Sequence, residues 1–309
     1  MGWSTPSCGS SAASSMTPER GHAAIAAVVG RLAGSRVHSL EPVHGGDICA
    51  AYRVRLADGR TVFTKSRPGS PPTFFAVEGA GLVRLGAVEG GVPVPSVIGF
   101  DTDCLVLEWV TPGRPTPKAA QHVGRALART HRAGAEVFGS ADGDIWIADL
   151  ILPGGPWQTW GELWAEGRIR PFLRSAVDRR SIEPSDAHDV ERVLAALPRL
   201  TGPAEPPSLI HGDLWAGNVL WGADGIARVV DPAVHGGHRE TDLAMLALFG
   251  LPFLAEVFAA YHEEWPLTSG WQARVALHQL HPVLVHAVLF GGAYGAQAGR
   301  LARAVLSSR

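Results

Sequence analysis

Three side chains in the second half of the chain have the types and the spacing that phosphoryl transfer requires. His211-Gly212-Asp213 is followed by Asn218, five positions after the aspartate, and by Asp231, thirteen positions further on. A carboxylate can accept the proton of an attacking hydroxyl, while an amide and a second carboxylate can hold Mg²⁺ against phosphates. We therefore interpret Asp213 as a catalytic base and Asn218 and Asp231 as metal ligands.

The alternative is an ordinary surface loop, because a lone His-x-Asp is common in proteins. The residues that follow favour a more rigid unit. Two apolar runs, 219–221 and 226–230, flank Asp224-Gly225, a dipeptide typical of a tight hairpin turn. Such a hairpin would hold the amide and the second carboxylate in a fixed relation to the base.

Short extended runs in the first third of the chain predict strands over 37–43, 48–56 and 60–66. The first two are joined by Gly45-Gly46-Asp47, where the glycines would let backbone amides approach a phosphate; a plain hairpin turn is the alternative. Lys65 lies on the third strand, from which it could reach the phosphates of a nucleotide, or it could be an exposed strand lysine.

A helix expected over 73–86 carries Glu78, which we predict to pair with Lys65; the alternative is a solvated helix charge. Two further strands, 97–100 and 104–110, end in Glu108-Trp109-Val110 just before Pro112-Gly113. An apolar strand that breaks into Pro-Gly is typical of a connector between lobes. We predict that backbone groups of Glu108, Trp109 and Val110 bind adenine.

Beyond this connector the sequence is mostly helical. Helices are expected over 117–134, 157–179, 185–198, 239–249, 252–264 and 270–306, the last with a break near Gly291-Gly292. The predicted fold class is therefore α+β, with a small β-rich N-terminal lobe over 17–110 and a larger, mainly helical C-terminal lobe over 111–309. Residues 1–16, rich in serine, glycine and alanine, are predicted to be a disordered leader.

The composition excludes several classes of function. A formal net charge of −2 gives no electrostatic case for binding nucleic acid or an anionic membrane. Three cysteines make neither a disulfide framework nor a metal cluster, so we expect a reducing, cytoplasmic location. No apolar run reaches the roughly 18 residues that a membrane span needs. The sequence leaves the oligomeric state open.

Over about residues 20–300, the sequence resembles the fructosamine kinases, also called ketosamine-3-kinases. These are a branch of the protein-kinase-like fold near the aminoglycoside phosphotransferases and choline kinases. The resemblance is carried by His211 to Asn218, by Asp231-Pro232-Ala233 and by the run from Gly237 to Met245. Trp215 and the Gly-His-Arg-Glu run 237–240 distinguish this family from its relatives, which share the His-Gly-Asp and the second aspartate.

The resemblance implies an ATP-dependent kinase that uses Mg²⁺ and phosphorylates the sugar 3-hydroxyl of ketosamines of the fructosamine or ribulosamine type. The 3-phosphate is unstable and eliminates, which frees the amine, so the implied role is deglycation. The acceptor would be a glycated amine, either a small molecule or part of a protein. Asp213 would be the base, Asn218 and Asp231 the Mg²⁺ ligands, and Lys65 and Glu78 an ion pair over the phosphates.

The resemblance also assigns an acceptor wall. Its predicted members are Trp215, His238, Arg239 and Glu240, while Asp242 is expected to brace the catalytic loop. Two departures from the family fall near this wall: Val234-His235-Gly236 replaces an aromatic pair, and Gln158-Thr159-Trp160 replaces Gln-x-Asn. They leave the preferred sugar open.

Cys49 follows the glycine loop, near where some members of the family carry a redox-active cysteine. The position is not clearly equivalent, and a buried small residue is the alternative interpretation.

Two other functions stay open at this point. One is another small-molecule kinase on the same fold, acting on an aminoglycoside or an amino alcohol. The other is a non-catalytic binding protein, which would be expected to lack at least one of Lys65, Asp213, Asn218 and Asp231; all four are present.

Overall fold

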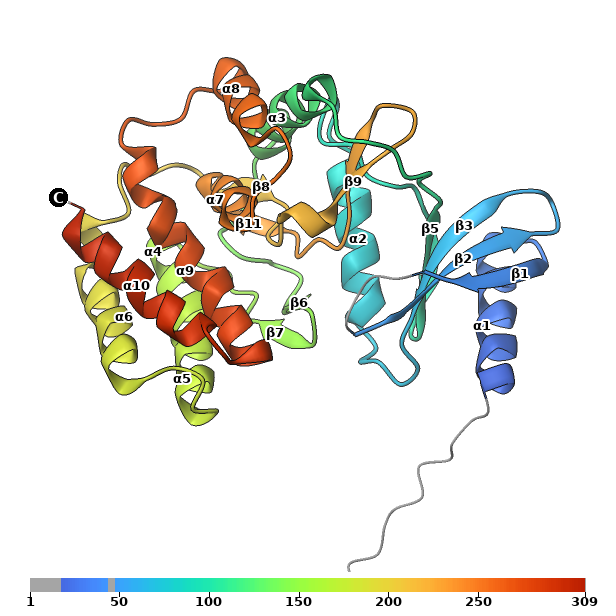
Figure 1. Ribbon diagram of the computed structural model, residues 1–309, viewed down its shortest axis with the longest axis horizontal. Helices are drawn as coiled ribbons and strands as arrows, with labels where there is room; N and C mark the ends of the chain where they lie inside the picture. The colour runs from blue at the N-terminus through green and yellow to red at the C-terminus, as the bar shows by residue number, and fades with distance from the viewer. Residues whose placement is uncertain (1–17, 44–47, 309) are drawn as a thin grey trace, which may run out of the picture.

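The computed structural model describes residues 18–43 and 48–308, which form a smaller and a larger lobe side by side (Figure 1). The smaller lobe contains a five-stranded sheet in which every neighbouring pair of strands is antiparallel. Its order is β1-β2-β3-β5-β4, with bounds Val37–Pro42, Ala50–Leu56, Thr61–Ser66, Cys104–Glu108 and Val97–Asp101. The predicted leader, 1–16, lies outside the described residues.

One helix covers each face of this sheet. Alternate residues of a strand point to opposite faces, so both sets are apolar where both faces are covered. In β5, Cys104 and Val106 pack with α1 (Pro18–Ala33), whereas Leu105 and Leu107 pack with α2 (Phe74–Gly86). Helix α2 therefore lies between the sheet and the larger lobe (Figure 1).

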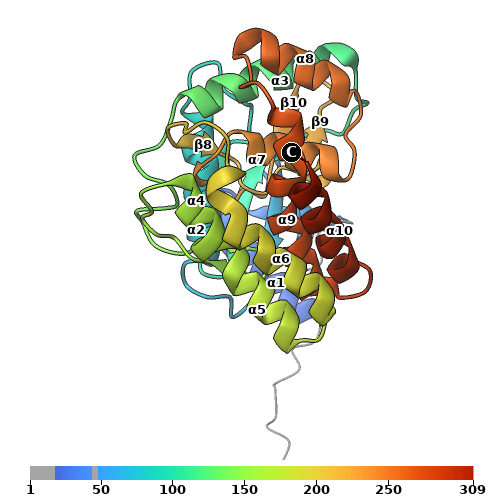
Figure 2. The same cartoon turned by 90° about the vertical axis from the view of Figure 1, so that its left-hand side faces the viewer.

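The larger lobe is built mainly from helices. They are α3 (Pro117–Arg132), α4 (Trp160–Glu162), a π-helix (Leu163–Ile169), α5 (Arg170–Asp178), α6 (Pro184–Ala196), α7 (Glu240–Leu248), α8 (Leu254–Glu264), α9 (Trp271–Phe290) and α10 (Tyr294–Ser307). Helices α5, α6, α9 and α10 cover the side of this lobe that faces away from the small lobe (Figure 2). They enclose the largest apolar core.

Short strand pairs lie between these helices. They are β6 (Ile145–Ile147) with β7 (Leu150–Leu152), β8 (Ser208–Ile210) with β11 (His235–Gly237), and β9 (Val219–Trp221) with β10 (Ala227–Val229). The β9–β10 pair is the hairpin predicted from Asp224-Gly225. The other two pairs, β6–β7 and β8–β11, were not predicted from the sequence.

Local sequence explains where the helices begin and break. The Thr116 side chain accepts a hydrogen bond from the Ala119 N–H, and Pro117 occupies the first helical turn, so α3 begins where predicted. The predicted helix 157–179 begins only at Trp160, because Thr159 caps it in a reciprocal capping box with Glu162. The predicted break near 291–292 separates α9 from α10, where both glycines have positive φ.

Within 18–43 and 48–308, no helix combines the length and the apolar character needed to cross a membrane.

A close contact between two helices of the larger lobe generates a first prediction. A Cβ atom on Gly124 of α3 would lie 2.3 Å from the Val257 carbonyl oxygen and 3.0 Å from the Ala260 Cβ, both on α8. Gly124→Ala should therefore lower the free energy of unfolding by about 1–3 kcal/mol. The measurement is denaturant unfolding at equilibrium.

The matched control is Gly21→Ala in α1, where an added Cβ meets nothing within 4 Å. This change should leave stability unchanged or raise it by up to about 1 kcal/mol, because alanine favours the helix. A Gly124→Ala protein as stable as the wild type would show that α3 and α8 are free to move apart.

Candidate active site

The loop between β8 and β9 is held from behind by Asp242, in the first turn of α7. Its carboxylate is fully buried and accepts hydrogen bonds from the backbone N–H groups of His211 at 2.7 Å and Gly212 at 2.9 Å. His131 Nε2 lies 3.1 Å from the same carboxylate. Burial opposes ionisation of Asp242, but the hydrogen bonds from His131 and from the Gly212 N–H hold its pKa below the usual value. The expected brace of the catalytic loop is therefore present.

His211 joins the loop to the segment that precedes Asp231. Its Nε2–H donates to the Val230 carbonyl oxygen at 2.9 Å, and its Nδ1 accepts from the Asp213 N–H at 3.2 Å. This pattern requires a neutral ring, and burial lowers the His211 pKa accordingly. Gly212 has a φ of +82°, and a Cβ there would lie 2.3 Å from the Ala233 carbonyl oxygen, so only glycine fits.

Asp213 and Asn218 contact each other directly. The Asn218 Nδ2 donates to the backbone oxygen of Asp213 at 2.8 Å and to its carboxylate at 3.2 Å. Burial, together with the negative charge of nearby Asp231, raises the Asp213 pKa to about 7. A carboxylate with this pKa can exchange a proton near neutral pH.

Asp231 lies at the junction of the two lobes. Its φ of +57° is a left-handed conformation that aspartate tolerates better than most residues. Its carboxylate is 2.6 Å from the Lys65 Nζ of β3, which is also 2.9 Å from Glu78 of α2. Burial disfavours the ammonium, but the two carboxylates outweigh this effect and raise the Lys65 pKa, so the group stays charged.

These contacts bring together the predicted base, both predicted metal ligands and the predicted lysine–glutamate pair. Asp213 and Asp231 face one another closely enough for the charge of one to raise the pKa of the other. The set of two carboxylates and an amide oxygen matches what Mg²⁺ prefers. The residues present therefore fit a hard divalent cation.

The connector between the lobes is anchored on the catalytic hairpin. The Gly113 N–H donates to Trp221 O at 2.6 Å, and the Ala223 N–H donates to Thr111 O at 2.8 Å. The Glu108 carboxylate accepts from the Ser96 hydroxyl at 3.0 Å, while the Trp109 ring lies 5.2 Å from the Arg53 guanidinium. Val110 follows Trp109 in the chain and is half-buried.

The predicted phosphate loop, Gly45, Gly46 and Asp47, lies outside the described residues. Cys49, just after it, is half-buried, and burial raises the pKa of its thiol. Since the thiolate is the reactive form, this environment does not activate Cys49.

The predicted acceptor wall requires correction at three residues, Arg239, Glu240 and His238. Arg239 is buried and makes two hydrogen bonds to Glu205, at 2.7 and 2.8 Å, with its guanidinium 4.0 Å above the Trp265 ring. Glu240 is buried and bonded through both oxygens to Arg274, at 2.9 and 2.5 Å. Both charges are satisfied inside the large lobe, so neither side chain is free to contact a sugar.

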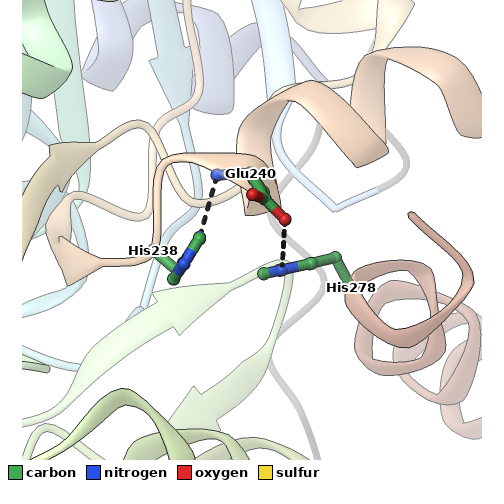
Figure 3. A group of neighbouring side chains, drawn as sticks. All are labelled: His238, Glu240 and His278. Atoms are coloured by element: carbon green, nitrogen blue, oxygen red, sulfur yellow. Dashed lines mark hydrogen bonds and ion pairs between the residues drawn. The ribbon is translucent and has the colours of Figure 1, made fainter. Parts of the chain in front are cut away.

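His238 belongs to the same buried network (Figure 3). Its Nδ1 accepts from the Glu240 N–H at 3.2 Å, while His278 Nε2 lies 3.4 Å from the Glu240 carboxylate. Two imidazoles and a carboxylate are a familiar metal-ligand set. Here Arg274 already bonds both carboxylate oxygens, so we interpret the network as a structural brace. The buried His278 Nε2 has no hydrogen-bond partner within the part of the chain that the structure describes.

Trp215 alone of the predicted wall is exposed, and it continues into a row of aromatic rings that the sequence did not reveal. Its ring lies edge-on to Phe249 at 6.0 Å, and Phe249 is 5.0 Å from His286. His286 in turn lies 5.6 Å from Phe290 and 5.0 Å from Tyr294. We call these five rings the aromatic ledge.

The two departures from the family pattern have local explanations. Val234 is buried in the core and packs on Gly81 of α2. Thr159 caps α4 through its side chain. Both therefore serve the fold and do not form part of an exposed acceptor surface.

A buried lysine lies with the predicted base and the predicted metal ligands at the junction of two lobes. This arrangement is that of a phosphotransferase of the kinase-like class. The chain belongs to the fructosamine kinase family, whose model matches residues 22–308. It is 33% identical over 268 residues to the probable ketoamine kinase of Enterococcus faecium, covering 84% of this chain and 92% of that protein.

Solved structures agree with this assignment. A candidate fructosamine-3-kinase from Thermobifida fusca has a TM-score of 0.87 and 49% identity, covering 92% of this chain and 99% of that one. The choline kinase of Streptococcus pneumoniae matches at a TM-score of 0.61 with 17% identity, over 93% of this chain and 99% of that one, and shows the shared fold alone. The predicted two-lobed, protein-kinase-like α+β fold is confirmed.

The geometry around Asp213 generates the next prediction. Asp213→Asn should lower kcat by about 10²–10⁴-fold, because an amide cannot accept the hydroxyl proton. The same change should raise Tm at pH 8 and raise it less at pH 5. The reason is that the folded-state pKa of Asp213 is raised to about 7, so the cost of ionising it develops as pH rises from roughly 4, the usual aspartate pKa, and is complete above about 7. Activity within a few-fold of the wild type would remove Asp213 from the role of base.

The wild-type pH profile provides the second measurement. Log kcat/KM should fall with unit slope below about pH 7, since protonated Asp213 cannot act as the base. A profile that stays flat down to pH 5 would contradict this assignment.

Proposed function

We propose that this protein is an ATP-dependent kinase that phosphorylates the sugar 3-hydroxyl of a ketosamine. The observation that carries the proposal is the contact set of Asp213, Asn218, Asp231 and Lys65, found in a chain of the fructosamine kinase family. The relatives named as ketoamine kinases support the choice of acceptor. The acceptor would be a glycated amine, either free or attached to a protein.

Asp213 would take the proton as the sugar oxygen bonds to the γ-phosphorus. In the same step the bond from that phosphorus to the β-phosphate oxygen breaks, and ADP leaves. The Asp213 pKa of about 7 suits this task, because the group is then both ionised in a useful fraction and basic enough. Loss of phosphate from the 3-phosphoketosamine would then release the amine, which would make the reaction a deglycation.

Lys65 would contact the nucleotide phosphates, and Glu78 would keep its ammonium in place. Asn218 and Asp231 would hold Mg²⁺, which when bound offsets the negative charge of the phosphates. The glycine segment 45–47, which lies outside the described residues, would contact the phosphates, and the backbone of 108–110 would bind adenine. Both assignments rest on the sequence pattern and on the position of the connector beside the catalytic hairpin.

Trp215 and the aromatic ledge would form the acceptor side, since Trp215 is two residues from the base and is exposed. Sugar C–H groups and the amine substituent can both pack on aromatic faces. His238, being buried, would support this side from within the network of Figure 3 without contacting the sugar. We propose a preference for shorter sugars such as ribulosamine or erythrulosamine.

One observation favours a second candidate. A row of exposed aromatic rings would also suit a cationic amine, as in choline or an aminoglycoside. Membership of the fructosamine kinase family favours the ketosamine.

We further propose a cytoplasmic location. The described cysteines, Cys49 and Cys104, are both free thiols, as expected in a reducing compartment.

The metal assignment predicts that Asp231→Ala weakens binding of Mg·ATP about tenfold or more, because a direct ligand is lost. Isothermal titration with a non-hydrolysable ATP analogue, with and without Mg²⁺, measures this. Asp224→Ala, in the exposed turn of the same hairpin, is the matched control and should bind normally. Unchanged affinity in Asp231→Ala would rule out the assignment.

The acceptor assignment predicts a ranking. With ATP and Mg²⁺, kcat/KM for the better of ribulosamine and fructosamine substrates should exceed that for choline or an aminoglycoside by about 10²-fold or more. Product analysis by ³¹P NMR should place the phosphate on O3. ADP formation without acceptor gives the background. An aminoglycoside or choline that outpaces every ketosamine would overturn the proposed function.

A further inference from the structure

A small cavity lies inside the large lobe, directly behind the catalytic loop. Ile210 and Gly212 line it on the loop side, and the π-helix and α9 line it on the other. It offers about 20 Å³ to the centre of a water-sized sphere. This is room for one or two waters or a monatomic ion, and too little for a phosphate or a sugar.

Arg168, from the π-helix, presents an unneutralised charge to this cavity. Its side chain is 4% exposed, and its Nη1 donates to the carbonyl oxygens of Pro153 and Gly167, both at 3.0 Å. Its Nη2 has no hydrogen-bond partner. Burial lowers the Arg168 pKa to about 9, and no carboxylate among the described residues acts on it, so the guanidinium stays charged at neutral pH.

The carboxylates of this region are already engaged elsewhere. Glu240 is bonded to Arg274 through both oxygens, and Asp242 is bonded to the loop backbone and to His131. A buried cation without a counter-ion is costly, and two carbonyl dipoles neutralise it only in part.

Three further ring nitrogens around the cavity also have no hydrogen-bond partner. They are the indole Nε1 of Trp164 and the Nε2 atoms of His278 and His281, all on buried side chains that line the cavity. An indole and a guanidinium can only donate, so they cannot satisfy each other. The guanidinium charge, the indole N–H and these imidazole nitrogens thus surround one small space without hydrogen-bond partners among the described residues.

We propose that this cavity binds a monatomic anion, of which chloride is the common example. The ion would accept hydrogen bonds from Arg168 and Trp164 and from the Nε2–H tautomer of His281, and would neutralise the guanidinium. A single water would satisfy the geometry only in part, because it accepts two hydrogen bonds and carries no charge. Since Gly212 forms part of the wall, the bound ion also supports the backbone that precedes Asp213.

Thermal unfolding in different sodium salts at constant ionic strength tests this proposal. Replacing gluconate by chloride or bromide should raise the Tm of the wild type saturably, by about 2–4 °C. Arg168→Met should abolish the difference between the salts. Arg170→Met removes an exposed arginine two residues away, which is paired with Glu166, and should retain it.

Diffraction provides a test that does not depend on a variant. Wild-type crystals grown in bromide should show an anomalous peak in the cavity within hydrogen-bond distance of Arg168 Nη2 and Trp164 Nε1. If the cavity contains only a water without anomalous signal, or if gluconate and chloride give the same Tm, the proposal is wrong. If Arg168→Met does not fold, the bromide peak in the wild type decides the question alone.

Discussion

The buried carboxylate of Asp242 is the constraint on which the catalytic loop depends. It accepts the N–H groups of two consecutive loop residues, His211 and Gly212, and has His131 of α3 as a further partner. A fully buried charge persists only where such bonds replace water. Because α7 carries Asp242 and α3 carries His131, the loop is tied to two helices. Through its hydrogen bond to the Val230 carbonyl oxygen, His211 also fixes the segment that precedes Asp231.

On the solvent side of the loop, by contrast, the negative charges of the carboxylates are not fully neutralised. Asp213 and Asp231 repel each other, and among the described residues Lys65 is the cation that contacts Asp231. Lys65 also pairs with Glu78, so its charge is shared between two carboxylates. This crowding raises the Asp213 pKa and costs stability at neutral pH. A bound cation would offset the repulsion. Perturbed carboxylates of this kind are typical of catalytic centres.

The sequence predicted the parts of the site that depend on local spacing. One loop and one hairpin contain Asp213, Asn218 and Asp231. Glu78 lies on the helix that follows the strand of Lys65. Arg239 and Glu240 were assigned wrongly because their partners, Glu205 and Arg274, are each 34 residues away, and only tertiary packing brings them together. The aromatic ledge was missed for the same reason, and strands of three residues are too short to give a pattern.

Several histidines around the loop are buried, and burial decides their charge at physiological pH. Burial lowers the pKa values of His211, His278 and His281, and it lowers those of His235 and His238 to about 3. These rings therefore act as neutral hydrogen-bonding groups throughout the physiological range. These five rings gain no proton near pH 7, whereas Asp213, with a pKa of about 7, changes its charge there. For the same reason they add no positive charge to the rear cavity, whose field comes from Arg168. The loop thus lies between Asp213, which titrates near neutral pH, and Arg168, which stays charged there.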